Sequence, residues 1–362
     1  MQVDMHYYGT YAMARAAGLR PETCKIIATA AQYVDDNANN QTEIIKDGAR
    51  VDVYATAHHW YDVKNVDERD QRLVWIPFHF LPGNEGGSYT ERLICRQDSK
   101  IAQEMIAHHL NHSDRPFIAE LMGVAAHVYA DTFSHYGFSG IGSRRNRIIN
   151  DTIRLHGLKG DVEEYVRKKA EKFFKQHGES GGLIKNIRAF LLNAAEALSG
   201  ALGHGAVATY PDRPYLHWDF IYEHTNLPSD RENQVTFLAG CRALHGMFRD
   251  LANQRPDLTD GNGRDFANIE DRVNSILGTQ AHCEGRIKAW QTASKAGDIF
   301  TSSEEIPIYD ENKWHHERSS FSSYEDSKEV RKLSSFRFFQ SAALHRTYVL
   351  RDLLPTHGIV ID

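Results

Sequence analysis

Paired cysteines, long apolar runs and an excess of basic residues are all missing from this sequence. The four cysteines lie far apart without a Cys-x-x-Cys pair, which argues against a disulfide framework and a thiolate zinc site. No apolar run approaches the length that a membrane span needs. Lys and Arg total 42 against 48 Asp and Glu, a formal charge of −6, so stable binding to duplex nucleic acid is not expected. The start lacks a basic stretch followed by an apolar one, so we expect no secretion signal and a cytoplasmic protein.

The composition is that of an ordinary folded domain, and most of the 362 residues have a helical pattern. Residues 74–83 are apolar and hold two prolines, which predicts an extended buried segment. Residues 144–160 are expected to be a polar excursion and 297–323 a loop. With no repeat and no linker, we predict one all-α helical bundle over 1–362 with irregular loop insertions. The predicted helices cover residues 7–18, 22–34, 99–110, 114–135, 161–176, 183–202, 232–253, 268–294 and 326–353.

The sequence has 20 histidines, and the most informative of them lie on the predicted central helix. His127, Asp131 and His135 are spaced by four residues and form one row with the carboxylate in the middle. The two histidines are about 12 Å apart along the axis, too far to bind the same ion. This geometry suits a carboxylate that bridges two metals, as in sites that cleave phosphate esters. The alternative is a His–Asp pair that stabilises the core.

Further candidate donors lie on both sides of this helix. Asp35 and Asp36 end a predicted helix, where carboxylates oppose the negative end of the helix dipole and a bound cation would explain them. A polar, frayed helix end is the alternative interpretation. The remaining candidates are imidazoles in aromatic or glycine-rich surroundings, for several of which surface or capping roles are the alternative: His6, His58, His59, His79 and His204.

In this order the motifs resemble the zinc-dependent phospholipase C superfamily, which includes single-strand-specific zinc nucleases. The run HVYADTFSHYG from His127 is similar to the metal helix of its phospholipase C and phospholipase D-type members. The segments MHYYGTYA and FHFLP resemble an uncharacterised bacterial branch. The resemblance covers about the first 140 residues and implies a helical bundle with two or three zinc ions, completed by helices within 141–362. The ligands that it implies are His6, Asp35 or Asp36, His58 or His79, His127, Asp131 as the bridge, and His135.

The sequence departs from that superfamily at two points. Established members bind zinc through the amine of a processed N-terminal Trp, whereas this chain begins with Met1. The His-x-x-x-Glu pair expected after the central helix is not evident. His204, Asp212 and His217 are the candidates to replace it.

The function that we predict is hydrolysis of a phosphate ester, the phosphodiester of a lipid headgroup or of a nucleotide, by a metal-activated water. Zinc is favoured because imidazoles and carboxylates without thiolates make the shell. One of Asp35 and Asp36 would orient or deprotonate the water while the other binds metal, and Asp131 would take part in catalysis as the bridge. Two alternatives stay open. One is an HD-like nucleotide phosphohydrolase, although no adjacent His-Asp pair occurs, and the other is a non-catalytic metal protein with a partner surface along 326–353.

Overall fold

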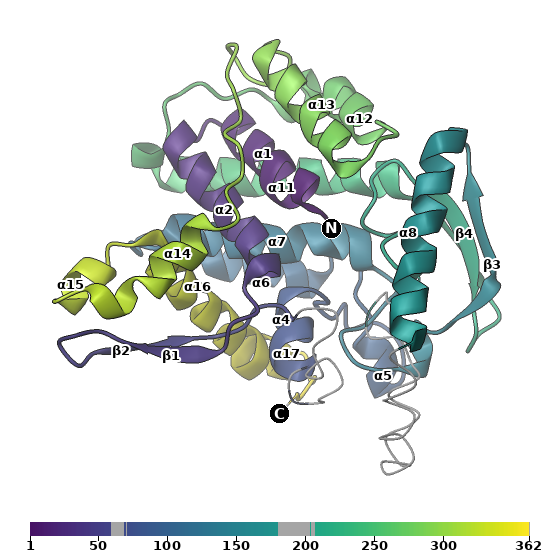
Figure 1. Cartoon of the computed structure of the whole chain (residues 1–362), viewed down its shortest axis with the longest axis horizontal. Coiled ribbons are helices and arrows are strands. Elements are labelled where there is room, and N and C mark those ends of the chain that lie inside the picture. The colour runs from purple at the N-terminus through teal and green to yellow at the C-terminus, as the bar shows by residue number, and fades with distance from the viewer. Residues whose placement is uncertain (59–68, 70, 180–202, 204–206, 362) are drawn as a thin grey trace.

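The core is built on α7 (Ile118–His135), a helix that is buried along its length except at Ala119. The computed structural model describes residues 1–58, 69, 71–179, 203 and 207–361. Four helices pack on α7: α2 (Pro21–Asp36), α6 (Lys100–Leu110), α11 (Asn233–Gln254) and α16 (Ser334–Tyr348) (Figure 1). The predicted central helix is therefore confirmed, and most of its small residues face neighbouring helices instead of solvent.

The N-terminal segment lies at the centre of the molecule. It forms a π-helical stretch, η1 (Asp4–Gly9), that continues into α1 (Thr10–Ala16). α1 packs between α2 and α11, whereas η1 packs between α2 and α13 (Cys283–Lys295) and also contacts α7. Figure 1 shows the N-terminus beside α7, so the first residues of the chain reach the C-terminal half of that helix.

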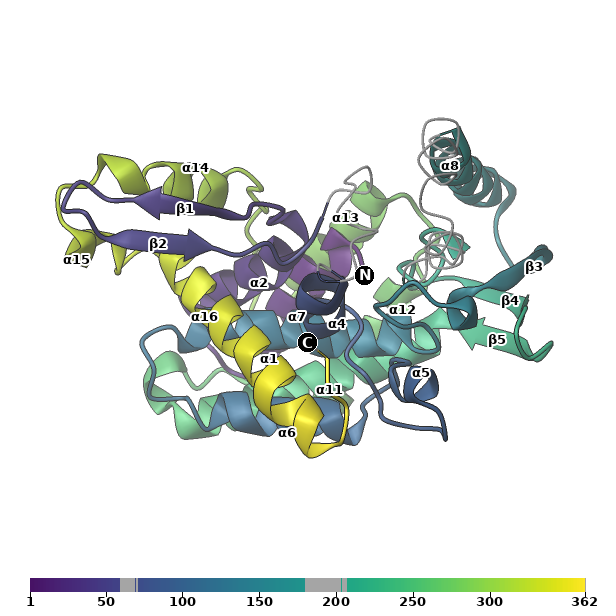
Figure 2. The same cartoon turned by 90° about the horizontal axis from the view of Figure 1, so that it is seen from below.

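Two antiparallel sheets make the fold a mixture of helices and strands, so the all-α prediction is wrong. β1 (Gln41–Ile44) pairs with β2 (Arg50–Val53), and β3 (Ile148–His156), β4 (His217–Tyr222) and β5 (Pro228–Glu232) form the second sheet in that order. The helix α8 (Gly160–Glu179) packs on the second sheet. The two sheets lie at opposite ends of the molecule (Figure 2).

Several other predicted segments differ from the structure. The segment expected to be extended at 74–83 is helical in its first half, in η3 (Gln71–Trp75) and α4 (Ile76–Phe78), because a proline in a first turn is compatible with a helix. Its second half is not helical, and Pro82 forms an isolated bridge with Cys95. The helix predicted over 268–294 is two helices, α12 (Glu270–Leu277) and α13, and the loop predicted over 297–323 contains α14 (Lys313–Ser319). The helix predicted over 183–202 lies outside the described residues.

None of the described helices is long and apolar enough to cross a membrane. The remaining elements of the described chain are short. They are α5 (Tyr89–Arg92), η4 (Arg144–Asn146), η6 (Pro256–Leu258), η7 (Phe266–Asn268), η8 (Phe321–Ser323), α15 (Ser327–Val330), η9 (Val349–Leu353) and α17 (Leu354–Thr356).

Candidate metal centre

The carboxylate of Asp131, on the C-terminal half of α7, lies at the centre of a group of imidazoles. Its Oδ1 is 3.2 Å from His6 Nε2, and its Oδ2 is 3.2 Å from His127 Nε2 and 3.4 Å from both His79 Nδ1 and His135 Nδ1. All five side chains are buried. The row predicted on the central helix therefore meets donors from η1 and from the residue after α4.

Asp35, at the end of α2, completes this group from the solvent side. Its carboxylate oxygens lie 3.8 Å from ring nitrogens of His6, His79 and His127. Its side chain is 32% exposed, whereas those of the three imidazoles are at most 3% exposed. Two overlapping sets have donor atoms close enough to bind one metal ion: His6, His127 and Asp131, and Asp35, His79 and His127.

The hydrogen bonds of the outer ring nitrogens fix which inner nitrogens carry lone pairs. His127 Nδ1 lies 2.7 Å from Ala31 O, and His79 Nε2 lies 2.8 Å from Thr56 O. Because a carbonyl only accepts, both of these nitrogens carry the proton and donate. In the neutral forms of these rings, His127 Nε2 and His79 Nδ1, 3.2 Å apart, direct lone pairs at each other and at Asp131. Such second-shell donation to a carbonyl is the usual arrangement of a histidine that binds metal.

His6 adds buried polar atoms that lack hydrogen bonds. Within the described residues neither of its ring nitrogens has a hydrogen-bond partner, and Asp131 Oδ2 has none either. The His6 ring stacks on His127 with centroids 3.8 Å apart. Unsatisfied buried polar groups are costly, and a cation would satisfy one ring nitrogen of His6 together with Asp131 Oδ2. The residues present therefore fit a metal ion.

The protonation states agree with this fit. Burial lowers the pKa of His6 to about 3, helped by the neighbouring positive charges, and burial also lowers the pKa of His79. Burial by itself raises the pKa of Asp131, but the charges of His135 and the Met1 ammonium hold it well below its usual range. His6 and His79 are thus neutral and Asp131 is ionised, the forms in which these side chains bind metal.

A second cluster lies around the other end of the row. The Met1 ammonium donates to Asp131 Oδ1 at 2.8 Å and lies 3.4 Å from Asp212 Oδ1. His135 Nδ1 donates to His79 O, so its Nε2 faces Asp212 Oδ1 at 3.2 Å and the ammonium at 3.5 Å. The nearby carboxylates, Asp131 foremost, raise the pKa of the amine to about 11 against the effect of burial. Asp131 therefore has positive or metal-binding groups on both sides, as expected for a bridge.

The structure separates the remaining candidates. Asp36 points away from the imidazoles and accepts hydrogen bonds from Tyr309 Oη and from Gln32 Nε2 at 3.1 Å, so Asp35 is the carboxylate of the pair that joins the group. Burial raises the pKa of Asp36 to about 6. His58 is buried but belongs to neither metal-binding set. His217 lies 2.8 Å from Asp230 at the surface, and His59 and His204 lie outside the described residues.

The sequence indicates Asp212 only as one of three candidate replacements, and no pattern in it indicates that the Met1 amine lies at the centre. Asp212 lies 77 residues from His135, in the loop that directly precedes β4, so no local spacing could connect the two. The signal that was present is the proline-flanked sequence Tyr210–Pro214, which predicts a constrained loop.

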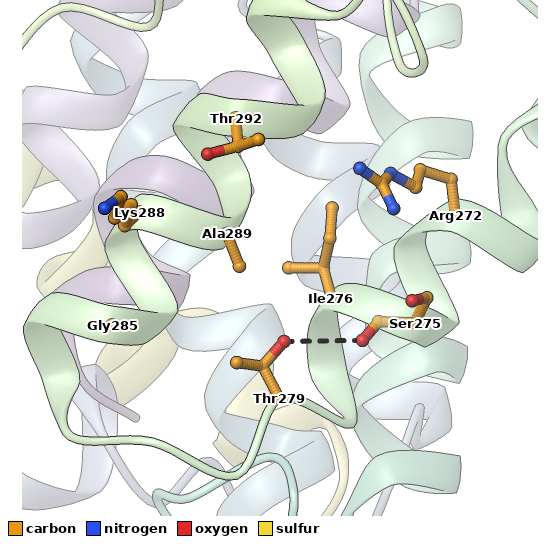
Figure 3. Close-up of a pocket in the computed structure, with 8 residues that line it drawn as sticks. All are labelled: Arg272, Ser275, Ile276, Thr279, Gly285, Lys288, Ala289 and Thr292. Atoms are coloured by element: carbon orange, nitrogen blue, oxygen red, sulfur yellow. Dashed lines mark hydrogen bonds between the residues drawn. The ribbon is translucent and has the colours of Figure 1, made fainter.

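A groove at the surface between α12 and α13 has different chemistry (Figure 3). Its volume is about 270 Å³, and the lining contains Arg272, Lys288 and several hydroxyls but no His, Cys, Asp or Glu. This groove therefore lacks the side chains that bind metal, and the cluster on α7 is the better candidate site.

A family model described as "Family of unknown function (DUF6765)" matches residues 1–353. Comparisons with curated proteins and with solved structures gave no match. The interpretation of the site therefore depends on its own geometry.

Proposed function

The chain belongs to the family of unknown function DUF6765, and we propose that this member is a zinc-dependent hydrolase of a phosphate ester. One observation carries the proposal: His79 Nδ1 and His127 Nε2 direct their lone pairs at each other and at Asp131 inside the core. Two lone pairs facing a carboxylate repel each other unless a cation lies between them. Such an arrangement costs stability, and metal binding explains why the fold contains it.

Zinc is the metal that this donor set favours. The donors are imidazole nitrogens and carboxylate oxygens, which suit zinc without thiolates. The first position would be held by Asp131 with His6, His79, His127 and Asp35. A second would lie between Asp131, His135 and Asp212, where the Met1 ammonium supplies positive charge in this structure.

Zinc supplies Lewis acidity, which acidifies water and neutralises charge on a phosphate. Asp35 is the one partly exposed side chain of the first position, so water and substrate would approach past it, and its carboxylate can accept a proton from that water. Asp36, the next residue, accepts a hydrogen bond from Tyr309. Asp131, buried and ionised, would keep both positions at a fixed spacing.

The test is metal analysis of the full chain, followed by hydrolysis of an aryl phosphodiester with and without a chelator. We expect bound zinc and chelator-sensitive turnover in the wild type, and loss of both in His127→Ala and Asp131→Asn. His217→Ala removes an exposed imidazole that pairs with Asp230 and serves as the matched control. Wild-type protein that binds no metal, or variants with unchanged turnover, would contradict the proposal.

A protonated His127 side chain is the alternative to a metal ion as the positive charge beside Asp131. Burial lowers its pKa, but Asp131 and Asp35 outweigh burial and raise it. An imidazolium at His127 would satisfy Asp131 without metal, and the protein would then be purified without zinc. The same metal analysis therefore separates the two explanations.

A structural metal site is the second candidate, favoured by the nearly complete burial of every proposed ligand except Asp35. A structural site is closed, whereas a catalytic site keeps an open position. Stoichiometric zinc without turnover of any phosphate ester would support this candidate.

A further inference from the structure

The loop that supplies Asp212 to the centre also carries a buried arginine. Arg213 is 2% exposed, and its Nη2 donates to Thr209 Oγ1 at 3.1 Å. Its Nε and Nη1 have no hydrogen-bond partner in the described part of the chain, and the same holds for the hydroxyl of Tyr215, two residues further on. Arg213 acts on the Tyr215 hydroxyl, so these three buried polar groups lie close together, and none of them has a hydrogen bond to another group of the described chain.

The charge around this loop is positive. Arg213 lies over the ring of Tyr165 on α8, 5.2 Å from its centroid, and makes no ion pair with the described residues. A second buried arginine, Arg286, lies 5.6 Å from the ring centroid of Tyr215. Arg286 donates hydrogen bonds of 2.7 and 3.0 Å to the carboxylate of Asp4, so the charge of Arg286 is already neutralised by an anionic partner.

α8 adds charges of both signs. Its Glu171 lies near enough to Tyr210 to add to the effect of burial, which raises the pKa of that hydroxyl, but no ion pair joins Glu171 to Arg213 in the described part of the chain. Arg167 is bonded to Glu163, 2.7 Å from its Oε1, and Lys169 Nζ lies 5.8 Å from the ring centroid of Tyr165. The guanidinium of Arg213 is therefore a buried cation whose positive charge no described carboxylate pairs with. Removing such a charge from water is unfavourable unless an anion accompanies it.

A phosphate oxygen would satisfy these groups. Guanidinium N–H groups form strong charge-assisted hydrogen bonds to phosphate, and a phenol hydroxyl donates to the same kind of oxygen. Asp212, which contacts His135 of the centre, is the residue before Arg213, so the same loop connects this pair of side chains to the centre.

We propose that Arg213 and Tyr215 form a phosphate-binding subsite that holds the phosphate group of the substrate beside the metal centre. Its position next to the centre rests on the proposed function, whereas anion binding itself needs no metal. The subsite would neutralise substrate charge that the metal ions do not contact, which favours a phosphate ester over an uncharged ester.

The test uses the full chain after metal has been removed with a chelator. Inorganic phosphate or chloride is added at equal ionic strength, and the melting temperature of the protein is measured. Phosphate should raise the wild-type melting temperature and chloride should not. In chloride, Arg213→Met should be at least as stable as the wild type, because it removes an unpaired buried charge. The variant should show no response to phosphate.

Tyr215→Phe removes a single hydroxyl and provides a second measurement if Arg213→Met does not fold. It should bind phosphate about tenfold more weakly, as expected for loss of one charge-assisted hydrogen bond. Lys288→Gln is the control, because Lys288 is exposed and lines the groove between α12 and α13 (Figure 3). A wild-type response in both loop variants, or a response lost in Lys288→Gln instead, would overturn the proposal.

Zinc content separates this inference from the proposed function. A phosphate response that depends on Arg213 in a protein that never binds zinc would support the subsite and refute the hydrolase. Zinc-dependent turnover with the same KM in wild type and Arg213→Met would refute the subsite alone. Titrating a dinucleotide and a glycerophosphodiester in the same way shows which of the two phosphodiesters binds more tightly. Tighter binding of either one that is lost in Arg213→Met supports the subsite.

Discussion

At the scale of single residues, the histidines of this protein form two kinds of buried network. In a histidine network apart from the candidate metal centre, His345 Nε2 donates to Pro77 O at 2.8 Å, and His345 Nδ1 lies 3.0 Å from His109 Nε2. His109 Nδ1 in turn lies 3.1 Å from His108 Nδ1. Each contact can pair one N–H with one lone pair, so neutral imidazoles satisfy this chain. Neutral imidazoles alone do not satisfy the centre around Asp131 in this way, and that contrast is the reason for proposing a metal there.

The acid Glu120, on the first turn of α7, predicts a pH dependence of stability. It is 1% exposed, and burial raises its pKa from 4.5 to about 7. Between these values the folded protein holds a proton that the unfolded chain has released, so the free energy of unfolding falls as pH rises and stays lower above pH 7. The expected loss is about 3 kcal/mol, from 1.36 kcal/mol per pKa unit. Glu120→Gln should remove this contribution, which urea unfolding at pH 5 and pH 8 measures.

Other groups titrate over the same range, so the informative quantity is the difference between wild type and variant. Glu329→Gln, at an exposed position that pairs with Lys332, is the control and should keep the wild-type dependence. Parallel pH profiles for wild type and Glu120→Gln would mean that Glu120 is already ionised in the folded protein.

Part of the metal centre could be predicted residue by residue. The spacing of His127, Asp131 and His135 places them in one row, because helical periodicity is local. The choice of Asp35 over Asp36 could not be predicted, since neighbouring residues on a helix point in directions about 100° apart and the partner of Asp36, Tyr309, is 273 residues away.

At the scale of elements, the contact between α2 and α7 depends on one glycine. A Cβ on Gly123 would lie 2.4 Å from both Ala30 Cβ and Ile27 O, so the two helices would have to separate. We expect Gly123→Ala to cost about 1–3 kcal/mol. It should also weaken zinc binding, because His127 donates to Ala31 O across the same contact. Urea unfolding and metal analysis measure the two effects.

Gly246 on α11 is the matched control for this prediction. A Cβ there would meet nothing within 4 Å. Gly246→Ala should therefore stabilise the protein by about 0.5–1 kcal/mol through the lower entropy of the unfolded chain. If both alanine variants were equally stable, the close packing of α2 on α7 would not be what limits stability.

The strands were missed for a reason that lies in their sequences. β3 is polar at most positions, and a shift in register between Ile149 and Arg154 interrupts the alternation that predicts a strand. Its apolar residues gain partners only when α8 and β4 pack on them, far away in sequence. The central helix, in contrast, is apolar nearly all round and could be predicted from its own residues.

At the scale of the whole molecule, the proposed metal ligands come from segments that the chain brings together only on folding. His6 lies in η1, Asp35 at the end of α2, His79 after α4 and Asp131 on α7. A metal that binds the folded but not the unfolded chain stabilises the fold by mass action, by about 2.7 kcal/mol at a concentration a hundredfold above Kd. Removing zinc with a chelator should therefore lower the melting temperature of the full chain, and adding zinc back should restore it.

Asp131→Asn should make the melting temperature insensitive to chelator and to zinc, because it removes the charge that the imidazoles and the Met1 ammonium share. Asp230→Asn changes an exposed carboxylate that pairs with His217, and it should respond like the wild type. A zinc-loaded wild type whose melting temperature does not change on chelation would place the bound metal at the surface, because an ion held by four distant segments cannot leave without weakening the contacts among them.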